Sequence, residues 1–279
     1  MKNWKDIIRH QSFRYIDHSV HTEIEGKPNT ALTSFAVDDA LAISVSEETS
    51  PPVIRLWVHP NTIVLGIPDS RLPFIDEGMQ FIEKNNYQAV VRNSGGLAVA
   101  LDEGVLNISL IIPGGKNLSI YDCYEAMVRF VQAMFHDLTD EIKAYEIVGS
   151  YCPGDYDLSI KGRKFAGISQ RRVKNGISVQ IYLDVEGNSN QRAELIQKFY
   201  TKGKKNKETT FTYPDIDPKV MGSLSELLGI TLTVNDVKKR VIHTLKKLTD
   251  KIVEMPFQEE EKMNFEKRYK QMVKRNQTN

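Results

Sequence analysis

Cysteine is scarce in this sequence of 279 residues, which contains only two, and the formal net charge is +1. Two cysteines are too few for a disulfide framework and are typical of proteins in a reducing compartment. A net charge near zero gives no global reason to expect binding to nucleic acid or to a membrane surface. The composition therefore predicts free cysteines and neither nucleic acid nor membrane among the partners.

Long apolar segments are also missing. No run reaches the roughly 18 apolar residues that predict a membrane-spanning helix. Residues 1–17 contain no apolar core followed by small residues, so they do not resemble a signal peptide. With 41% hydrophobic and 26% charged residues the composition is typical of a globular protein. We therefore expect a cytoplasmic protein.

Several common catalytic and binding motifs are absent. The sequence has no GxxxxGK[ST] phosphate loop, no GxGxxG fingerprint and no Gly-x-Ser-x-Gly nucleophile elbow. Among the six histidines, His18 and His21 lie close together, but in a polar segment without cysteines or patterned carboxylates nearby. The sequence therefore predicts no metal site.

Hydrophobic periodicity predicts alternating helices and strands in the first half of the chain. Leu32, Phe35, Ala36, Ala40 and Ile43 recur at helical spacing, and Pro51-Pro52 ends that pattern. One strand-like segment is expected over residues 53–68, a short helix over 74–86, and another strand over 87–93. Residues 104–113 alternate and predict a strand with one buried face. A second amphipathic helix is expected over 119–138.

The second half begins with a predicted antiparallel meander over residues 157–185. Turns are expected at Lys161-Gly162 and at Asn175-Gly176, since Asn-Gly between alternating apolar runs favours a two-residue hairpin turn. Helical patterns follow over residues 192–200, 225–229, 236–248 and 257–275. The fold class predicted is α/β (α+β), with a mixed, largely antiparallel sheet and flanking helices.

The two cysteines differ in their surroundings. Cys152 precedes a Pro-Gly turn with Asp155 and Tyr156 close by, so its thiol could be reached by a substrate. The alternative is a small apolar residue at the end of a strand. Cys123 falls within a helical pattern and is expected to be structural.

Lys164 lies twelve positions after Cys152 and begins the strand that follows the Lys161-Gly162 turn. A two-residue loop pairs Ser159 with Lys164, so register alone does not bring the lysine to the cysteine. If the Pro-Gly loop folds back over the hairpin, the ammonium would favour the thiolate. The alternative is a solvated strand lysine.

A glycine pair follows Arg92, Asn93 and Ser94 between two predicted strands. Gly95 and Gly96 would let the backbone approach a ligand closely and expose amide donors. The alternative is an ordinary turn.

The order of these segments resembles one known family. Residues 92–109 are similar to the signature of lipoate–protein ligases and octanoyltransferases, Arg-x-x-(Ser/Thr)-Gly-Gly-x-Ala-Val leading into Leu-x-x-Ser. A similar strand precedes it at residues 55–66, and Asp157-Leu158 with residues 162–167 match the Asp-Leu…Gly-x-Lys-x-Ala-Gly hairpin that follows. The resemblance implies a biotin/lipoyl ligase-like domain over residues 31–250. Residues 1–30 would be an extension packed on it, and residues 251–279 a helical tail.

The resemblance also indicates a subgroup. The ATP-using ligases carry a glycine and a histidine where this sequence has Leu97 and Leu101. A cysteine just before Tyr-Asp-Leu, as at Cys152, is similar to Gram-positive octanoyltransferases with a cysteine acyl intermediate, and most of all to those that move octanoyl between proteins. This implies octanoylated H protein of the glycine cleavage system as donor, lipoyl domains of 2-oxoacid dehydrogenase complexes as acceptors, and no cofactor.

The same resemblance implies residue roles. Cys152 would be the acyl-thioester nucleophile, and Lys164 would hold its thiol ionised and protonate a leaving amine. Substrate-binding positions would be Arg92, Ser94, Gly95, Gly96, Leu97, Leu101, Ala166 and Gly167. Three alternatives stay open: an octanoyltransferase that uses octanoyl-acyl carrier protein, a ligase that needs ATP and Mg²⁺, and a lipoyl-domain or acyl-binding protein without turnover.

Overall fold

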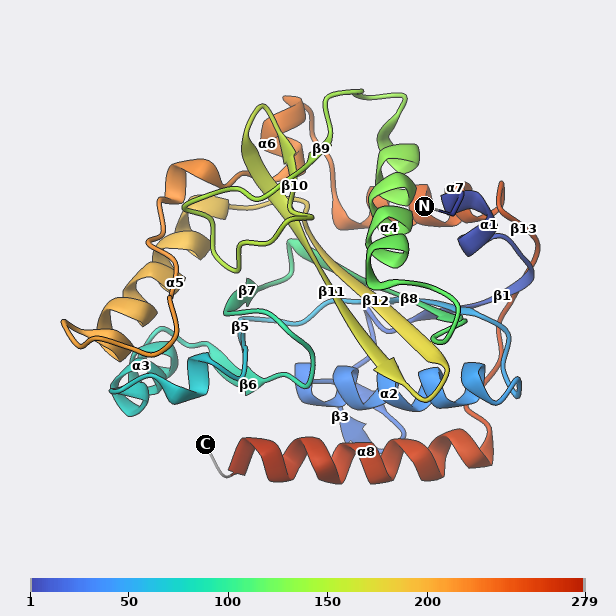
Figure 1. The fold of residues 1–279 in the computed structure, drawn as a ribbon, viewed down its shortest axis with the longest axis horizontal. Coiled ribbons are helices and arrows are strands. Elements are labelled where there is room, and N and C mark those ends of the chain that lie inside the picture. The colour runs from blue at the N-terminus through green and yellow to red at the C-terminus, as the bar shows by residue number, and fades with distance from the viewer. Residues whose placement is uncertain (1, 278–279) are drawn as a thin grey trace.

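A mixed eight-stranded sheet forms the centre of the computed structural model, which describes residues 2–277 (Figure 1). Its strand order is β13-β1-β4-β8-β12-β11-β10-β9. Strand β1 runs parallel to β4 and β13, whereas the remaining neighbours are antiparallel. The predicted mixed, largely antiparallel sheet is therefore confirmed. The strands are β1 (His10–Asp17), β4 (Val53–Trp57), β8 (Val105–Pro113), β9 (Lys143–Ala144), β10 (Leu158–Ile160), β11 (Arg163–Val173), β12 (Gly176–Asp184) and β13 (Thr249–Val253).

A second, three-stranded sheet has the order β6-β5-β7, with β5 (Thr62–Leu65), β6 (Gln88–Val91) and β7 (Val99–Leu101). The single strand expected over residues 53–68 is therefore wrong. The chain leaves β4 at Trp57 and enters β5 in the other sheet, with His59 and Pro60 between them. Proline lacks the N–H that a continuous ladder needs, which favours a break there. A short hairpin pairs β2 (Glu23–Ile24) with β3 (Lys27–Pro28).

Helices cover both faces of the large sheet. Side-chain caps fix several of their starts: Thr30 caps α2, and Ser119 with Asp122 forms a capping box at α4. The predicted inward residues of α4, Met127, Val131, Met134 and Phe135, are all buried. The helices are α1 (Trp4–Ile8), α2 (Ala31–Ser46), α3 (Ile75–Lys84), α4 (Ile120–Phe135), α5 (Ser189–Lys204), α6 (Leu224–Leu228), α7 (Val234–Leu245) and α8 (Glu259–Gln277), with 3-10 turns η1 (Asp69–Arg71) and η2 (Pro218–Val220).

Strand β8 is buried on both faces, which corrects the expectation of one buried face. Leu106, Ile108 and Leu110 face the core under α4, whereas Val105 and Ile111 belong to the core under α2. Along this strand one face is apolar and the other is apolar or carries small polar residues, because helices pack on both faces. An antiparallel strand in the middle of a three-layer arrangement thus has no solvent face.

Of the two predicted hairpin turns, one is found where the sequence predicted it and the other is displaced. Lys161 and Gly162 have φ angles of 51° and 76°, as the predicted turn requires, and Ser159 pairs with Lys164. The second turn lies one residue earlier than predicted, at Lys174-Asn175, because Gly176 already pairs with Val173. A Cβ at Gly176 would lie 2.0 Å from the carbonyl oxygen of Ala42. Glycine is therefore required at position 176 by the close approach of α2 and not by the turn.

Both outer segments of the chain contribute to the large sheet: β1 lies within residues 1–30, and residues 251–253 of the tail complete β13. Helix α8 then runs beside α2 (Figure 1). Its two ends are attached to the sheets: Glu261 forms a buried ion pair with Arg14 at 2.6 Å, and Asn276 hydrogen-bonds to both backbone groups of Val91. No helix within residues 2–277 has the length and apolar character needed to span a bilayer.

Candidate active site

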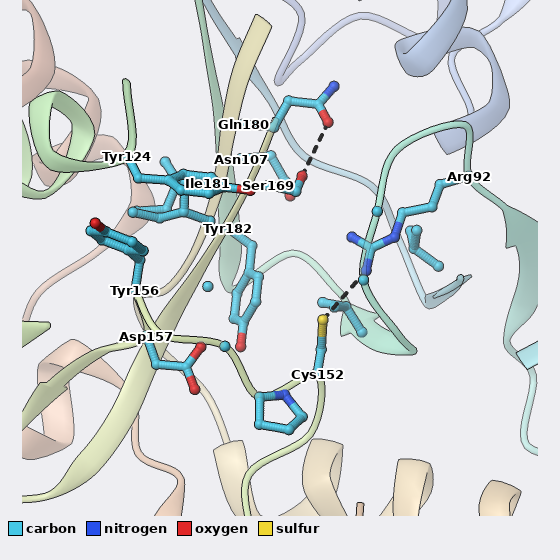
Figure 2. Close-up of a pocket in the computed structure, with 18 of the residues that line it drawn as sticks. Arg92, Asn107, Tyr124, Cys152, Tyr156, Asp157, Ser169, Gln180, Ile181 and Tyr182 are labelled. Carbon is cyan, nitrogen blue, oxygen red and sulfur yellow. Dashed lines mark hydrogen bonds between the residues drawn. The ribbon is translucent and has the colours of Figure 1, made fainter. Parts of the chain in front are cut away.

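A cavity of about 290 Å³ lies where the glycine loop between β6 and β7 meets the loop that precedes β10 (Figure 2). Its lining is largely apolar, and strands β11 and β12 supply one wall. Such a volume is near the lower end for small-ligand pockets, about 300 Å³. Of the residues predicted from the sequence, it brings together Cys152, Arg92, Gly95, Gly96, Leu101 and Gly167.

Cys152 is half-buried and projects its thiol into this cavity from a strained position. Its φ angle is 46°, in the left-handed region that residues with a Cβ rarely adopt. Such a conformation costs about 1–3 kcal/mol and persists only where neighbouring contacts enforce it. Other non-glycine residues of the chain, such as Lys161 and Lys174, share this conformation in turns, so for Cys152 it is the combination with the cavity that points to function.

Two N–H donors point at the sulfur of Cys152. The Nη2 of Arg92 lies 3.3 Å from Sγ, and the backbone nitrogen of Leu97 lies 3.2 Å from it. The same Nη2 donates to the carbonyl oxygen of Leu97 at 2.7 Å, so the guanidinium is fixed to the glycine loop. A cation and an amide dipole at the sulfur stabilise negative charge there.

Gly96 makes this arrangement possible. Its φ angle is 112°, and an added Cβ would lie 2.0 Å from Nη2 of Arg92 and 3.0 Å from Sγ of Cys152. A side chain at this position would therefore displace the guanidinium from the sulfur. At Gly95 an added Cβ would meet no atom of the described structure within 4 Å. The two glycines of the motif thus have different constraints.

Lys164 is fully buried and binds the backbone of the cysteine loop. Its Nζ lies 2.8 Å from Oδ1 of Asp157 and donates to the carbonyl oxygens of Tyr151 (2.9 Å) and Cys152 (2.8 Å). The hydroxyl of Ser150 lies at 3.2 Å. Burial raises the pKa of Asp157, and the charge of Lys164 opposes that rise. The contacts place Lys164 as the residue that holds the Cys152 backbone, while its predicted action on the thiol stays a prediction.

The remaining predicted positions lie in different surroundings. Leu97, 8% exposed, presents its backbone N–H to Sγ, whereas Leu101 lies in the cavity wall together with Val99. Ala166 is fully buried within the hairpin core, and the hydroxyl of Ser94 is buried without a hydrogen-bond partner among the described residues.

Several lining residues were not predicted from the sequence. They come from segments far from the motif, and include Phe35 of α2, Trp57 of β4, Tyr124 of α4, and Gln180 and Tyr182 of β12. Most belong to helix or strand patterns that indicate only burial. The alternation in β12 was the one available signal, because it places Gln180 and Tyr182 on the face opposite the Val179 and Ile181 core positions.

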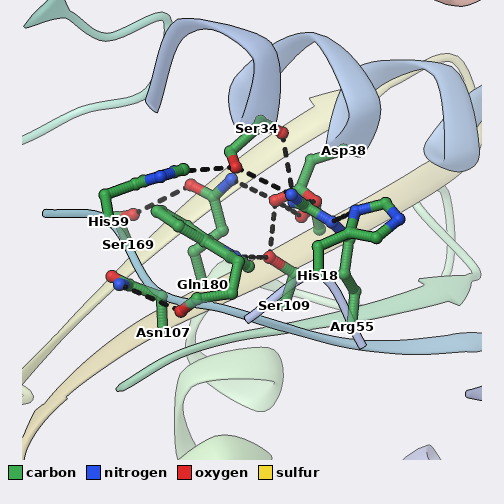
Figure 3. Close-up of polar contacts among 11 residues, drawn as sticks. His18, Ser34, Asp38, Arg55, His59, Asn107, Ser109, Ser169 and Gln180 are labelled. Carbon is green, nitrogen blue, oxygen red and sulfur yellow. Dashed lines mark hydrogen bonds and ion pairs between the residues drawn. The ribbon is translucent and has the colours of Figure 1, made fainter. Parts of the chain in front are cut away.

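A buried polar network supports one end of the cavity (Figure 3). Asp38 of α2 pairs with Arg55 at 2.7 Å and accepts a hydrogen bond from Nε2 of Gln180 at 2.6 Å. Arg55 also donates to Nδ1 of His18, and the hydroxyl of Ser34 lies 2.9 Å from Nε2 of His59. Burial, followed by the charge of Arg55, lowers the pKa of His18 to about 2 and that of His59 to about 3. The network therefore holds Gln180 in the cavity wall through Asp38. Both histidines of the network are neutral at neutral pH.

The second cysteine and the acidic residues offer no additional site. Cys123 is free and fully buried, and burial raises the pKa of its thiol to about 11. Within residues 2–277 no group of three or more histidine, cysteine or carboxylate side chains is arranged to hold a metal ion.

Comparison with known proteins assigns the family. Residues 30–246 match the model of the lipoyl protein ligase A/B catalytic domain. The chain is 87% identical, over the full length of both proteins, to the octanoyl-[GcvH]:protein N-octanoyltransferase of Oceanobacillus iheyensis. It is 44% identical to the lipoyl-[GcvH]:protein N-lipoyltransferase of Listeria monocytogenes, over 97% of this chain and 96% of that protein.

Solved structures support the fold. A lipoate-protein ligase A bound with ATP superimposes with a TM-score of 0.68, covering 93% of this chain and 94% of that one at 15% identity. A bipartite lipoate protein ligase from Thermoplasma acidophilum gives a TM-score of 0.67, covering 94% and 92% at 15% identity. The sequence match, the fold and the cysteine-containing cavity agree, and the chain belongs to the lipoyl protein ligase A/B catalytic domain family as an acyltransferase.

Proposed function

We propose that this protein transfers an octanoyl group from octanoylated glycine-cleavage H protein to the lysine of lipoyl domains in 2-oxoacid dehydrogenase complexes, through a thioester on Cys152. The main support is the position of the Cys152 sulfur, which faces an apolar cavity and accepts hydrogen bonds from Arg92 and from the N–H of Leu97. The names of the relatives from Oceanobacillus and Listeria, which specify a GcvH-bound acyl donor, support the choice of donor.

The chemistry balances without a cofactor. In the first half, Sγ attacks the amide carbonyl of the octanoyl-lysine, the C–N bond breaks, and the donor lysine leaves as an amine that takes up the proton of the thiol. In the second half, the acceptor amine attacks the thioester, the C–S bond breaks, and the amine's proton returns to the sulfur. One amide replaces another, so ATP is not required. The thioester divides one slow exchange into two easier steps.

The cavity suits an acyl chain better than a charged ligand. Phe35, Trp57, Val64, Val99 and Leu101 contribute apolar wall, and burial of each methylene contributes about 0.8 kcal/mol. Binding energy from the chain would hold the carbonyl carbon near Sγ, which is the positioning that such a transfer needs. The leucines at positions 97 and 101, in place of the ligases' glycine and histidine, favour transfer over the ATP-dependent alternative.

Intact-mass spectrometry tests the proposal. The protein is incubated with octanoylated H protein without ATP, beside Cys152→Ser and Cys123→Ser variants. We expect an octanoyl adduct on the wild type and on Cys123→Ser that hydroxylamine removes, and none on Cys152→Ser. Passage of the label to an isolated lipoyl domain then identifies the acceptor.

Other outcomes would replace the proposal. An adduct that forms only with octanoyl-acyl carrier protein would establish a different donor. Modification of the lipoyl domain only with free lipoate, ATP and Mg²⁺ would establish a ligase. Binding of lipoyl domains by the Cys152→Ser variant, with no turnover by the wild type, would establish a binding protein.

A further inference from the structure

The proposed reaction needs a donor for the oxyanion that forms on the attacked carbonyl, and the donors described so far contact the sulfur or the backbone of Cys152. Arg92 and the N–H of Leu97 both donate to Sγ from the glycine-loop side. The N–H groups of Lys164 point to Asp157, Ser150 and two backbone carbonyls, and its side chain is fully buried. A further donor on another wall of the cavity would complete the site.

Tyr182 lies on such a wall. It is a residue of β12, 7% exposed, and it lines the same cavity as Cys152. Its buried hydroxyl makes no hydrogen bond to a backbone group or a charged side chain among the described residues, and it interacts with the hydroxyl of Tyr151. Figure 2 shows the hydroxyl end of the ring reaching down from β12 toward the cysteine loop, between Asp157 and Cys152. The contact between two hydroxyls uses only one of their two hydrogens, so when Tyr151 is the donor the hydrogen of Tyr182 is available to a ligand group in the cavity.

The chain makes specific room for this ring. Gly167 is paired directly with Tyr182 across β11 and β12, and a Cβ at Gly167 would lie 2.8 Å from Cε1 of the tyrosine. Tyr151 also stacks on this ring, with ring centroids 5.9 Å apart and planes 27° from parallel. The close approach to Gly167 and the stacked ring of Tyr151 therefore both restrict the orientation of the hydroxyl.

The hydroxyl has the protonation state that a donor needs. Burial, and then the neighbouring Tyr151, Asp157 and Cys152, raise the pKa of Tyr182 well above its ordinary value of 10. The phenol therefore stays protonated at neutral pH and can donate a hydrogen bond to a developing negative charge. It is correspondingly a weak acid, which suits stabilisation of the oxyanion better than transfer of a proton to the leaving amine.

We propose that the Tyr182 hydroxyl donates a hydrogen bond to the carbonyl oxygen of the acyl group as that oxygen gains negative charge during attack by Cys152. This inference rests on the proposed thioester chemistry. It assigns Gly167, which the sequence predicted as a substrate-binding position, the role of admitting the tyrosine ring.

Two reactions of the same sulfur separate this role from a general effect on the site. Acylation by octanoylated H protein passes through an oxyanion, whereas alkylation by iodoacetamide uses the same thiolate but forms none. For Tyr182→Phe we expect the single-turnover acylation rate to fall about 100-fold, as for the loss of one oxyanion donor, with an unchanged alkylation rate. Tyr213→Phe is the matched control, because Tyr213 is also 7% exposed but donates to Pro68 outside the cavity. It should acylate at the wild-type rate.

Gly167→Ala provides a second variant that keeps the hydroxyl. Displacement of the ring should reduce acylation, and the double variant with Tyr182→Phe should lose no more than Tyr182→Phe alone, since both changes act through one group. Acylation of Tyr182→Phe at the wild-type rate would overturn the inference, as would an equal fall in alkylation. Failure of the wild type itself to acquire the adduct would instead reject the proposed function.

Discussion

The ammonium group of Lys164 donates to the backbone carbonyl of Cys152, with 2.8 Å between nitrogen and oxygen. The left-handed backbone of Cys152 is therefore tied to a charge that is itself buried against Asp157. Contacts with the sulfur come instead from the glycine loop, through Arg92 and Leu97. Contacts with the main chain and contacts with the sulfur of Cys152 are thus divided between two segments, and substitutions can separate them.

Loss of the Lys164 charge should primarily destabilise the fold. Lys164→Met leaves the carboxylate of Asp157 buried and unpaired, and breaking such a pair costs about 3–5 kcal/mol. Urea unfolding measures the loss. Asp157→Asn combined with Lys164→Met should recover part of it, since the uncompensated charge is gone. Equal stability of Lys164→Met and the wild type would contradict this account.

Loss of the Arg92 guanidinium should primarily slow the reactions of the Cys152 thiol. Hydrogen bonds to charged groups contribute about 1.5–3 kcal/mol, so Arg92→Met should reduce the rate of iodoacetamide alkylation by about 10- to 100-fold at neutral pH. Arg129→Met is a suitable control because Arg129 pairs with Glu125 on the exposed side of α4. Alkylation of Arg92→Met as fast as that of the control would show that the guanidinium does not stabilise the thiolate.

The two motif glycines should respond differently to alanine. Gly96→Ala places a methyl group at the position of Arg92 Nη2 and requires a strained φ of 112°, so it should lower stability and slow alkylation of Cys152. Gly95→Ala meets open space and should shift the melting temperature little. Thermal unfolding compares the two. A similar melting temperature for both variants would mean that the loop rearranges freely.

Acid should destabilise the protein through its buried histidines. Burial lowers the pKa of His59 to about 3, so between that value and about 6.5 the unfolded chain carries a proton that the folded one lacks. Stability is then lost as the pH falls, by about 1.4 kcal/mol per pH unit for this group. Asp69, whose pKa burial raises to about 6, acts in the opposite direction.

Comparison with a variant isolates the histidine contribution. The unfolding free energies of the wild type and His59→Gln are measured in urea at pH 7, 6 and 5. The difference between them should decrease toward pH 5, because the variant no longer takes up that proton on unfolding. A constant difference would indicate that His59 titrates alike in both states.

The tail should influence the site through Asn276. Its side-chain amide accepts from the N–H of Val91 at 2.7 Å and donates to its carbonyl at 3.2 Å, next to Arg92. Asn276→Leu should therefore slow alkylation of Cys152 several-fold while most of the fold persists. Asn264→Leu in the same helix is the control, since its side chain has no such bond to an edge strand among the described residues. Equal alkylation rates of the two variants would show that the tail affects only the stability of the fold.

Local signals predicted the hairpin and the motif well, because both depend on neighbours in sequence. The Lys161-Gly162 turn fixes the pairing of Ser159 with Lys164, and the positive φ at its second position suits glycine. The role of Gly176 could not be predicted in this way. Its constraint comes from the carbonyl of Ala42, more than a hundred positions away.

The site was predicted in its parts but not in its contacts. Cys152, Lys164 and Arg92 were recognised from motif order, yet only the fold shows that the arginine reaches the sulfur and the lysine reaches the backbone. Phe35 carried no sequence signal beyond burial, and the alternation in β12 assigned Tyr182 to a face of the strand without indicating a cavity there. Such positions are set by how α2 and β12 pack around the cavity, which a single sequence does not specify.

The bond between Asn276 and Val91 spans 185 positions of the chain. The end of the strand that leads to Arg92 therefore takes its backbone partner from a helix that is remote in sequence. Detachment of helix α8 would free this strand end beside Arg92, so the surroundings of the sulfur are coupled to the docking of a distant segment and not only to neighbours in sequence.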